Sequence, residues 1–330
     1  MKLSFIIPVY NGSASILKCL TSTIPYLNME CEAVVIDDGS TDDSASIVAD
    51  LASKQVGIRL IKQENRGQSA ARNEAIRQAI GDYIWCLDSD DWLSSEGMKE
   101  IIDTIEKKKY DVIVIGRMEE YQNYSKKTPN IGLQEYANGM EYFDEAALTG
   151  IYRTQPWNMI VRRDIIIGNN VTFPEGRTFE DIYWGIDIFI HSKAVITLPV
   201  HPYHYQLANE NSLTKQVHMR DLDIIWIINN CAHLLDEKGY SVKSNSPSFL
   251  SLIYWFVSSA IMKKYIPLYK ENKGAKEIVD STLSDPLFKR SIRYAATHYI
   301  GIQRSALALL MLISKRGYCC LLNFVLRHAR

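Results

Sequence analysis

The sequence has little of what marks several large protein classes. Its six cysteines form no CxxC pair and no spacing of the secreted, disulfide-bonded kind, so we expect a reducing compartment. The longest apolar runs, residues 249–262 and 305–314, fall short of the ~18 residues that a membrane-spanning helix requires. The apolar run at residues 3–9 is too short for a signal peptide and reads as a strand.

Net charge is also nearly absent, at -1, so the chain lacks the global basic field that nucleic-acid binding requires. This sum hides a division, because residues 1–220 carry -8 and residues 221–330 carry +7. The basic, apolar C-terminal part fits an interfacial amphipathic segment, and an ordinary core helix with a basic outer face explains it equally well. The change of charge predicts one domain over residues 1–218 and a helical region over residues 219–330.

Short runs rich in Val and Ile alternate with longer amphipathic segments in the first half of the chain. The expected strands are residues 3–9, 32–36, 58–62, 82–87 and 111–115. The expected helices are residues 13–24, 41–54, 67–80 and 94–108, with Gly81 as the stop of the third. Further along, helices are expected at residues 178–192, 219–235, 247–267 and 288–326, and one or two strands at 195–206. This order predicts an α/β fold with βαβ units and a mostly parallel sheet flanked by helices.

Polar loops that contain glycine or aspartate follow four of these strands. They are residues 10–12, 37–40, 63–67 and 88–91. Because parallel strands end at one edge of a sheet, and ligands bind beyond that edge, these loops are expected to meet there. No GxGxxG motif follows the first strand, which disfavours a dinucleotide site of the Rossmann type.

The loop after the fourth strand, in the stretch "YIWCLDSDDW", carries Asp88, Asp90 and Asp91. Two carboxylates one residue apart suit a hard divalent cation such as Mg²⁺, which takes one or two protein carboxylates and completes its shell with water and phosphate oxygens. The alternative is an acidic loop before a helix. However, Ser94 or Ser95 can already cap that helix, so the aspartates are surplus to capping.

Asp38 and Arg72 each allow two interpretations. Residues 39–43 explain a turn and a helix start, whereas Asp38 at the strand tip is free to accept a hydrogen bond from a base or ribose. Arg72 lies one turn into the helix at residues 67–80, where its guanidinium can meet a phosphate or the aspartates. The alternative is a surface arginine paired with Glu74 or Glu64.

A second acidic pair, Glu180 and Asp181, stands at the start of a predicted helix. Thr178 and Asp181 have the spacing of a capping box, and a general base at the ligand edge is the other interpretation. His201 and His204 could reach a metal, although an isolated histidine is more often a surface or core residue.

These residues together resemble family 2 glycosyltransferases with the GT-A fold, a Rossmann-like mixed sheet, and notably the bacterial enzymes that build capsule and other surface polysaccharides. The resemblance covers residues 1 to about 215. It is carried by "SFIIPVYNG", "VIDDGSTDDS", "NRGQSAARNEAI", "GDYIWCLDSDDW", "PWNMIVRRD", "FEDIYW" and "YHYQLANENSLT". The chain departs from the family pattern at Met159, where a lysine is frequent, and in the family's "YYR"-like segment, which reads Tyr203-His204-Tyr205-Gln206 here.

The resemblance implies roles for particular side chains. The nucleotide-sugar site would comprise Pro8, Tyr10, Asn11, Asp38, Arg72, Asp88 and Ser89. A Mn²⁺ or Mg²⁺ ion would bind Asp90 and Asp88, with His204 as a third candidate. Asp181, beside Glu180, would be the catalytic base, and Trp157 would lie on the acceptor side.

The implied reaction is an inverting transfer of a hexosyl or N-acetylhexosaminyl group from a UDP-sugar to a hydroxyl of a saccharide or lipid-linked saccharide. The expected place is the cytoplasm, at the inner face of the membrane if residues 219–330 contact it. Two alternatives remain open at this point. One is a Mg²⁺-dependent phosphoryl or nucleotidyl transferase, since Asp-x-Asp after a strand also serves aspartyl-phosphate phosphatases. The other is a sugar-nucleotide-binding protein without turnover.

Overall fold

The structure, a computed structural model, divides the chain into two compact units. One comprises residues 1–142 and 153–209, and the other residues 143–152 and 210–330. The described residues are 2–27, 30–107, 110–152, 155–207, 218–240, 246–265, 268–269, 272–298 and 308. Residues 208–214 of the last family motif and nearly all of the basic segment after residue 298 lie outside them.

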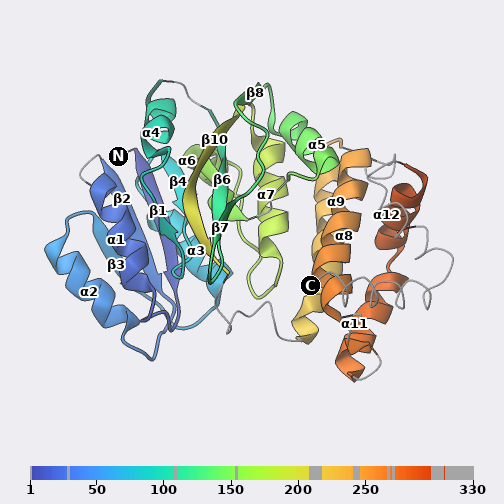
Figure 1. Cartoon of the computed structure of the whole chain (residues 1–330), viewed down its shortest axis with the longest axis horizontal. Helices are drawn as coiled ribbons and strands as arrows, with labels where there is room; N and C mark the ends of the chain where they lie inside the picture. Colours follow the sequence, from blue (N-terminus) through green and yellow to red (C-terminus); the bar gives the residue numbers. More distant parts are fainter. Residues whose placement is uncertain are drawn as a thin grey trace. The chain divides into compact units, whose positions relative to one another are not determined.

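The first unit is built on one sheet, in which the described residues form ten strands (Figure 1). The strands are β1 (Leu3–Val9), β2 (Cys31–Asp37), β3 (Ile58–Lys62), β4 (Tyr83–Cys86), β5 (Trp92–Leu93), β6 (Val112–Glu120), β7 (Ser125–Lys127), β8 (Gln134–Tyr136), β9 (Met159–Arg162) and β10 (Val195–Gln206). Their order is β3-β2-β1-β4-β9-β6-β10-β5, with β7 on β6 and β8 on β10.

The sheet is mixed, as the predicted fold class requires. Strands β3, β2, β1 and β4 run parallel, and β10 runs parallel to β6, whereas β9 is antiparallel to both β4 and β6. The register pairs Val9 with Asp37, and Asp37 with Lys62, so β1, β2 and β3 end side by side. The loops that follow them therefore start at one edge.

Helices cover the sheet of the first unit and make up most of the described part of the second, and α5 (Gly139–Thr149) begins in the first unit and continues into the second. The first set is α1 (Ile16–Leu27), α2 (Ser44–Lys54), α3 (Gln68–Gln78), α4 (Met98–Lys107), α6 (Arg163–Gly168) and α7 (Glu180–His191), with the short η1 (Pro156–Asn158). The second is η3 (Met219–Leu222), α8 (Asp223–Glu237), α9 (Pro247–Val257), η5 (Ser258–Met262), α10 (Lys263–Tyr265), α11 (Lys273–Ser284) and α12 (Pro286–Thr297). None of the helices in the described ranges has the length and apolar character needed to cross a membrane.

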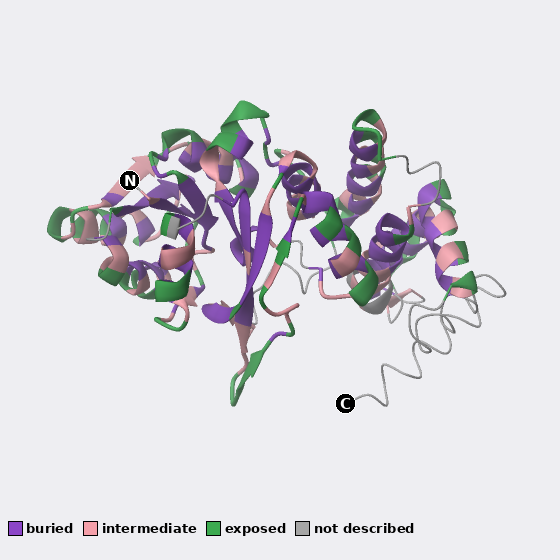
Figure 2. Cartoon of the chain, turned by 90° about the horizontal axis from the view of Figure 1, so that it is seen from above, coloured by how far each residue is buried: buried purple, intermediate pink, exposed green. Residues whose placement is uncertain are grey.

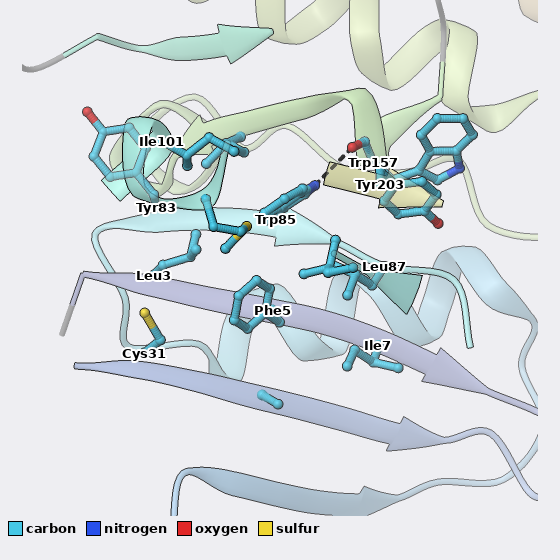
Figure 3. Close-up of a cluster of buried hydrophobic side chains, with 14 of the residues drawn as sticks. Leu3, Phe5, Ile7, Cys31, Tyr83, Trp85, Leu87, Ile101, Trp157 and Tyr203 are labelled. Atoms are coloured by element: carbon cyan, nitrogen blue, oxygen red, sulfur yellow. Dashed lines mark hydrogen bonds between the residues drawn. The ribbon is translucent and has the colours of Figure 1, made fainter. Parts of the chain in front are cut away.

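A continuous apolar core lies against one face of the sheet (Figure 3). Phe5 and Trp85 from β1 and β4 are fully buried, with their ring centroids 5.8 Å apart. The Trp85 indole Nε1–H donates to the carbonyl oxygen of Trp157 at 2.9 Å, so burying this ring leaves its donor satisfied. Trp157 stacks on Tyr203 with ring centroids 4.4 Å apart, which extends the core toward the carboxyl ends of the strands.

Two expectations about the end of α3 are wrong. The helix was expected to run to residue 80, but it ends at Gln78, and Ile80 beyond it is 60% exposed. Gly81 is not the residue that stops the helix. A Cβ at Gly81 would lie 2.6 Å from the Ser4 hydroxyl oxygen, so glycine is needed there because the chain passes directly over β1. Residues 195–206 form a single strand with a shifted register between Leu198 and Tyr203.

Candidate active site

The loops after β1, β2 and β4 touch one another at the carboxyl edge of the sheet. The Asn11 backbone N–H donates to the Ser40 hydroxyl at 3.0 Å, and the Asn11 side-chain oxygen accepts from the Thr41 N–H at 2.8 Å. A Cβ at Gly12 would lie 3.3 Å from the Ser89 hydroxyl oxygen. Because glycine has no side chain, the loop of residues 88–91, called the aspartate loop below, can lie close to the loop after β1. The predicted convergence of these polar loops is therefore confirmed.

Asp38 joins the loops after β2 and β3. It is 3% exposed, and its Oδ1 accepts from the Gln63 amide at 2.6 Å and the Arg66 backbone N–H at 2.9 Å. Its Oδ2 accepts from the Gly67 N–H at 2.8 Å. A carboxylate has about four acceptor positions, so roughly one is left at Asp38 for a ligand.

Arg72 connects the aspartate loop to the start of α7. Its Nη2 donates to Asp88 Oδ1 at 2.7 Å and its Nη1 donates to Glu180 Oε1 at 2.9 Å. Because Arg72 is 3% exposed, the alternative of a surface arginine paired with Glu74 or Glu64 is wrong. The ion pairs hold together residues that lie 108 positions apart in the sequence.

The charges around Arg72 perturb one another. Burial alone would lower the pKa of the Arg72 guanidinium, but the charges of Asp88 and Glu180 outweigh burial and raise it. Burial raises the pKa of Glu180 above the usual carboxyl range, and although Arg72 opposes that rise, the neighbouring charge of Asp181 adds to it. Arg72 is therefore a fixed cation that stabilises a crowded acidic site.

The three aspartates of the loop have three different surroundings, and Asp91 is the buried one. It is 1% exposed, and its carboxylate accepts from the Tyr203 hydroxyl at 2.5 Å and from the Gln206 N–H at 2.8 Å. The same Tyr203 oxygen accepts from the Asp88 N–H at 3.2 Å. Asp91 and Tyr203 thus connect the aspartate loop to the end of β10. The local sequence around either residue did not predict this role.

Asp88 and Asp90 lie at the carboxyl edge of the sheet, called the rim below. The bonds from Arg72 and from the Gln68 amide both end on Asp88 Oδ1, so Oδ2 has no hydrogen-bond partner among the described residues. Asp90 is exposed on the loop, yet crowding by the surrounding loops and then the charge of Asp88 raise its pKa. No basic side chain in the described part of the chain pairs with Asp90. Two adjacent carboxylates with open oxygens fit a hard cation.

The described residues provide no further side chain that would complete a metal site with Asp88 and Asp90. Across the described ranges, no three His, Cys, Asp or Glu side chains converge to hold a metal ion. The His204 Nδ1 lies 2.7 Å from Glu120 Oε1, and its ring stacks on Trp92 at 5.2 Å. The Glu120 contact occupies one ring nitrogen of His204 and leaves Nε2 open. Because His204 does not form a cluster of three with Asp88 and Asp90 in the described ranges, the donor set that the structure brings together is Asp88 with Asp90.

Glu180 and Asp181 occupy the first turn of α7. The helix begins at Glu180, and Phe179 before it has a left-handed φ of 61°. Thr178 therefore lies one residue before the N-cap position, which is Phe179. The capping box and the general base both stay predictions for Asp181. A left-handed backbone at a residue other than glycine costs about 1–3 kcal/mol and is concentrated at functional sites.

The remaining predicted site residues lie at different depths. Tyr10 is 53% exposed at the rim, whereas Pro8 is buried within β1. Trp157 is 2% exposed and lies beneath the rim, stacked on Tyr203. A cavity of about 790 Å³ lies elsewhere, lined by Lys2, Gly81 and Arg162 near the opposite ends of the strands. The site is therefore marked by its convergent side chains.

Removing only the Tyr203 hydroxyl should loosen the aspartate loop. In Tyr203→Phe, the stacked ring remains, but Asp91 loses a donor and the Asp88 N–H loses an acceptor. We expect the free energy of unfolding to fall by about 1–3 kcal/mol, the range for buried groups left unsatisfied. Urea denaturation measures this loss, and Tyr26→Phe, half-buried on α1, is the matched control. An equal loss of unfolding free energy in Tyr203→Phe and Tyr26→Phe would exclude a stabilising link between the Tyr203 hydroxyl and the aspartate loop.

The sheet order and the acidic rim define a glycosyltransferase fold of the GT-A type. The structure of S. aureus TarS 1–349 in complex with UDP-GlcNAc matches with a TM-score of 0.76 at 18% identity, covering 100% of this chain and 93% of that chain. The profile of "Glycosyl transferase family 2" matches residues 4–168. The chain therefore belongs to glycosyl transferase family 2.

Similar sequences carry glycosyltransferase names. EpsJ of Bacillus subtilis, named an uncharacterized glycosyltransferase, is 30% identical over 219 residues, which is 64% of this chain and 62% of EpsJ. The cholesterol galactosyltransferase of Borreliella burgdorferi is 26% identical over 318 residues, covering 84% of this chain and 85% of that protein. The match spans about three fifths of the length of EpsJ and of the putative glycosyltransferase EpsH of the same organism, 62% and 60%.

Proposed function

We propose that the chain transfers a sugar from a nucleoside-diphosphate sugar, with UDP-sugar as the expected donor, to a hydroxyl of a saccharide or lipid-linked saccharide, with inversion at the anomeric carbon. The observation that carries this proposal is the arrangement around Arg72. This one buried cation joins Asp88 of the aspartate loop to Glu180 beside Asp181. The groups needed for the leaving diphosphate and for the attacking hydroxyl are thus held in one place.

The donor would lie across the loops at the carboxyl edge. Asp38 has about one acceptor position left for a base or ribose donor, and the exposed Tyr10 ring offers a surface for a base. Arg72 acts on the donor through Asp88 because its own charge is already paired. The proposed donor site comprises Pro8, Tyr10, Asn11, Asp38, Asp88 and Ser89, with Arg72 as the residue that positions Asp88.

Asp90 and Asp88 Oδ2 would hold a Mn²⁺ or Mg²⁺ ion, whose ligand preference is for oxygen. A bound divalent cation neutralises the charge that builds on the diphosphate as it leaves. The protein's own part is to keep the two carboxylates close despite their repulsion. The pairs from Arg72 to Asp88, and from Tyr203 to Asp91, supply that restraint.

Asp181 is the proposed base. It accepts the proton of the acceptor hydroxyl while the oxygen forms a bond to the anomeric carbon from the side opposite the diphosphate. The bond from that carbon to the phosphate oxygen breaks, and its electron pair leaves with the nucleoside diphosphate. This single displacement inverts the carbon and needs no covalent enzyme intermediate. The Glu180–Arg72 pair fixes the first turn of α7, and with it Asp181.

Relatives and charge support finer parts of the proposal. The names of TarS and of the cholesterol galactosyltransferase favour a hexosyl or N-acetylhexosaminyl group, and the bacterial relatives favour synthesis of surface polysaccharide. We propose residues 1–218 as the catalytic domain. The +7 net charge of residues 221–330 supports a helical region that contacts anionic membrane at the inner face in the cytoplasm.

A donor panel tests the function. Thermal shifts with UDP-, GDP- and dTDP-sugars, with and without Mn²⁺, should show stabilisation by UDP-sugars that depends on the cation, followed by sugar transfer in a product assay. Release of phosphate to water without any acceptor sugar would favour a phosphoryl transferase. Binding without turnover across the tested acceptors would favour a sugar-nucleotide-binding protein.

A further inference from the structure

A row of polar and aromatic side chains runs outward along β6 into the hairpin with β7. Arg117 and Glu119 alternate along the strand and therefore share a face, and Tyr121 follows directly after the strand ends at Glu120. The Arg117 Nη2 donates to Glu119 Oε1 at 2.6 Å, and the Tyr121 hydroxyl donates to Glu119 Oε2 at 3.1 Å. Tyr124 stacks on Tyr121 with ring centroids 4.5 Å apart. These four residues form a connected row.

The adjacent strand β10 continues the row sideways. The parallel register places Tyr203 beside Arg117 and Tyr205 beside Glu119. The Arg117 guanidinium lies 5.6 Å from the Tyr205 ring and 5.0 Å from the Trp157 ring, within the range of cation–π attraction. Tyr205 is only partly buried, so part of this residue remains accessible at the surface.

The inner end of the row lies at the proposed reaction site. The Tyr203 hydroxyl, on the strand beside Arg117, accepts the hydrogen bond of the Asp88 N–H. From Arg117 to Tyr121 the chain extends ~14 Å outward, at about 3.4 Å per residue. The row therefore starts beside the aspartate loop and ends at an exposed hairpin, whose residues 122–127 are all exposed (Figure 2).

Hairpin stability alone does not account for these residues. A cross-strand aromatic pair can stabilise a hairpin, but Tyr124 remains 59% exposed. Arg117 is 9% exposed, and neither its Nε nor its Nη1 finds an acceptor in the described part of the chain. Burying the charged Arg117 guanidinium costs desolvation free energy, which its ion pair with Glu119 offsets only in part. This cost has a functional reason if Arg117 must hold the Glu119 carboxylate in a fixed position.

We propose that this row, comprising Arg117, Glu119, Tyr121, Tyr124 and Tyr205, binds the acceptor as a neutral saccharide chain of at least two sugar units. The less polar faces of the sugar rings pack on Tyr205, Tyr121 and Tyr124, and hydroxyls of the chain donate to Glu119. Arg117 is a positioning residue that orients Glu119. The chain is neutral because the Arg117 charge is already balanced by Glu119. This inference rests on the proposed function, whose acceptor it specifies.

The test compares oligosaccharide binding in two double variants. Tyr121→Ala with Tyr124→Ala removes both rings, whereas Tyr121→Phe with Tyr124→Phe keeps them, and Tyr240→Ala on the other unit is a surface control. The probes are neutral mono- and hexasaccharides of glucose, galactose and N-acetylglucosamine, with a hyaluronan hexasaccharide as the anionic arm. Calorimetry in the presence of UDP and Mn²⁺ measures each affinity, and circular dichroism verifies folding.

In the wild type, we expect a neutral hexasaccharide to bind more tightly than its monosaccharide. The alanine pair should weaken that binding at least tenfold and leave the affinity for UDP within twofold, and the phenylalanine pair should retain it within threefold. Unchanged binding in the alanine pair, preference for hyaluronan, or no hexasaccharide binding while UDP still binds would each overturn the acceptor row. Absence of UDP binding would instead contradict the proposed donor, so the two failures are distinguishable.

Discussion

Asp181→Asn is expected to lower kcat for sugar transfer by about 10²–10⁴, the contribution of a general base. Asparagine keeps the size of the side chain but cannot take the proton from an acceptor hydroxyl. The affinity for the UDP-sugar should remain within a few-fold of the wild type, because Asp181 acts on the acceptor. Steady-state kinetics with saturating donor, together with calorimetry of donor binding, separate the two effects.

The neighbouring Glu180→Gln variant is the matched control for Asp181→Asn. Both changes remove one carboxylate from the first turn of α7, but Glu180 is already paired with Arg72 at 2.9 Å. We expect Glu180→Gln to lower the free energy of unfolding, because the ion pair with Arg72 is lost. Its kcat should fall less than that of Asp181→Asn. An Asp181→Asn enzyme that retains more than about a tenth of the wild-type kcat would exclude Asp181 as the base.

Asp90→Asn is expected to remove most of the stimulation by Mn²⁺. Asp90 is exposed on the loop and has no cationic partner among the described residues, so its carboxylate is accessible to a cation. Burial and then the charge of Asp88 raise its pKa, and a bound cation would relieve the repulsion between the two carboxylates. Lewis-acid stabilisation of a leaving group contributes several kcal/mol, which corresponds to about 10²–10³ in kcat/KM at 1.36 kcal/mol per tenfold change. Activity measured across a Mn²⁺ titration tests this.

Glu64→Gln provides the control, because Glu64 is an exposed acid in the loop after β3. It removes one negative charge near the rim without removing a proposed metal ligand, and it should leave the Mn²⁺ dependence unchanged. The melting temperature of Asp90→Asn without metal should equal or slightly exceed that of the wild type, since a like-charge contact with Asp88 is lost. Identical Mn²⁺ dependence in the two variants would contradict the assignment of Asp90.

The location of the site could be predicted because the rule behind it is topological. Successive parallel strands end at one edge, so the loops containing Asp38 and Asp88 had to meet wherever the helices between them packed. The boundaries of β1 and β3 could be predicted for a different reason, because short β-branched runs match these strands. These are properties of short segments and their order.

The partners of individual charges could not be predicted, because they depend on packing between distant segments. Arg72 has Glu74 and Glu64 nearby in sequence but pairs with residues 16 and 108 positions away. The partner of Asp91 on β10 is 112 positions distant. The left-handed backbone of Phe179 likewise has no local signature, since phenylalanine does not favour that conformation.

Calorimetric titration of UDP into the wild-type protein, with Mn²⁺ and with EDTA, tests the central claim most directly. If Asp88 and Asp90 hold a cation against the diphosphate, UDP should bind at least tenfold more tightly with Mn²⁺, and Asp90→Asn should abolish the difference. Equal UDP affinity with Mn²⁺ and with EDTA, or a difference that persists in Asp90→Asn, would contradict a metal-bridged nucleotide at this rim.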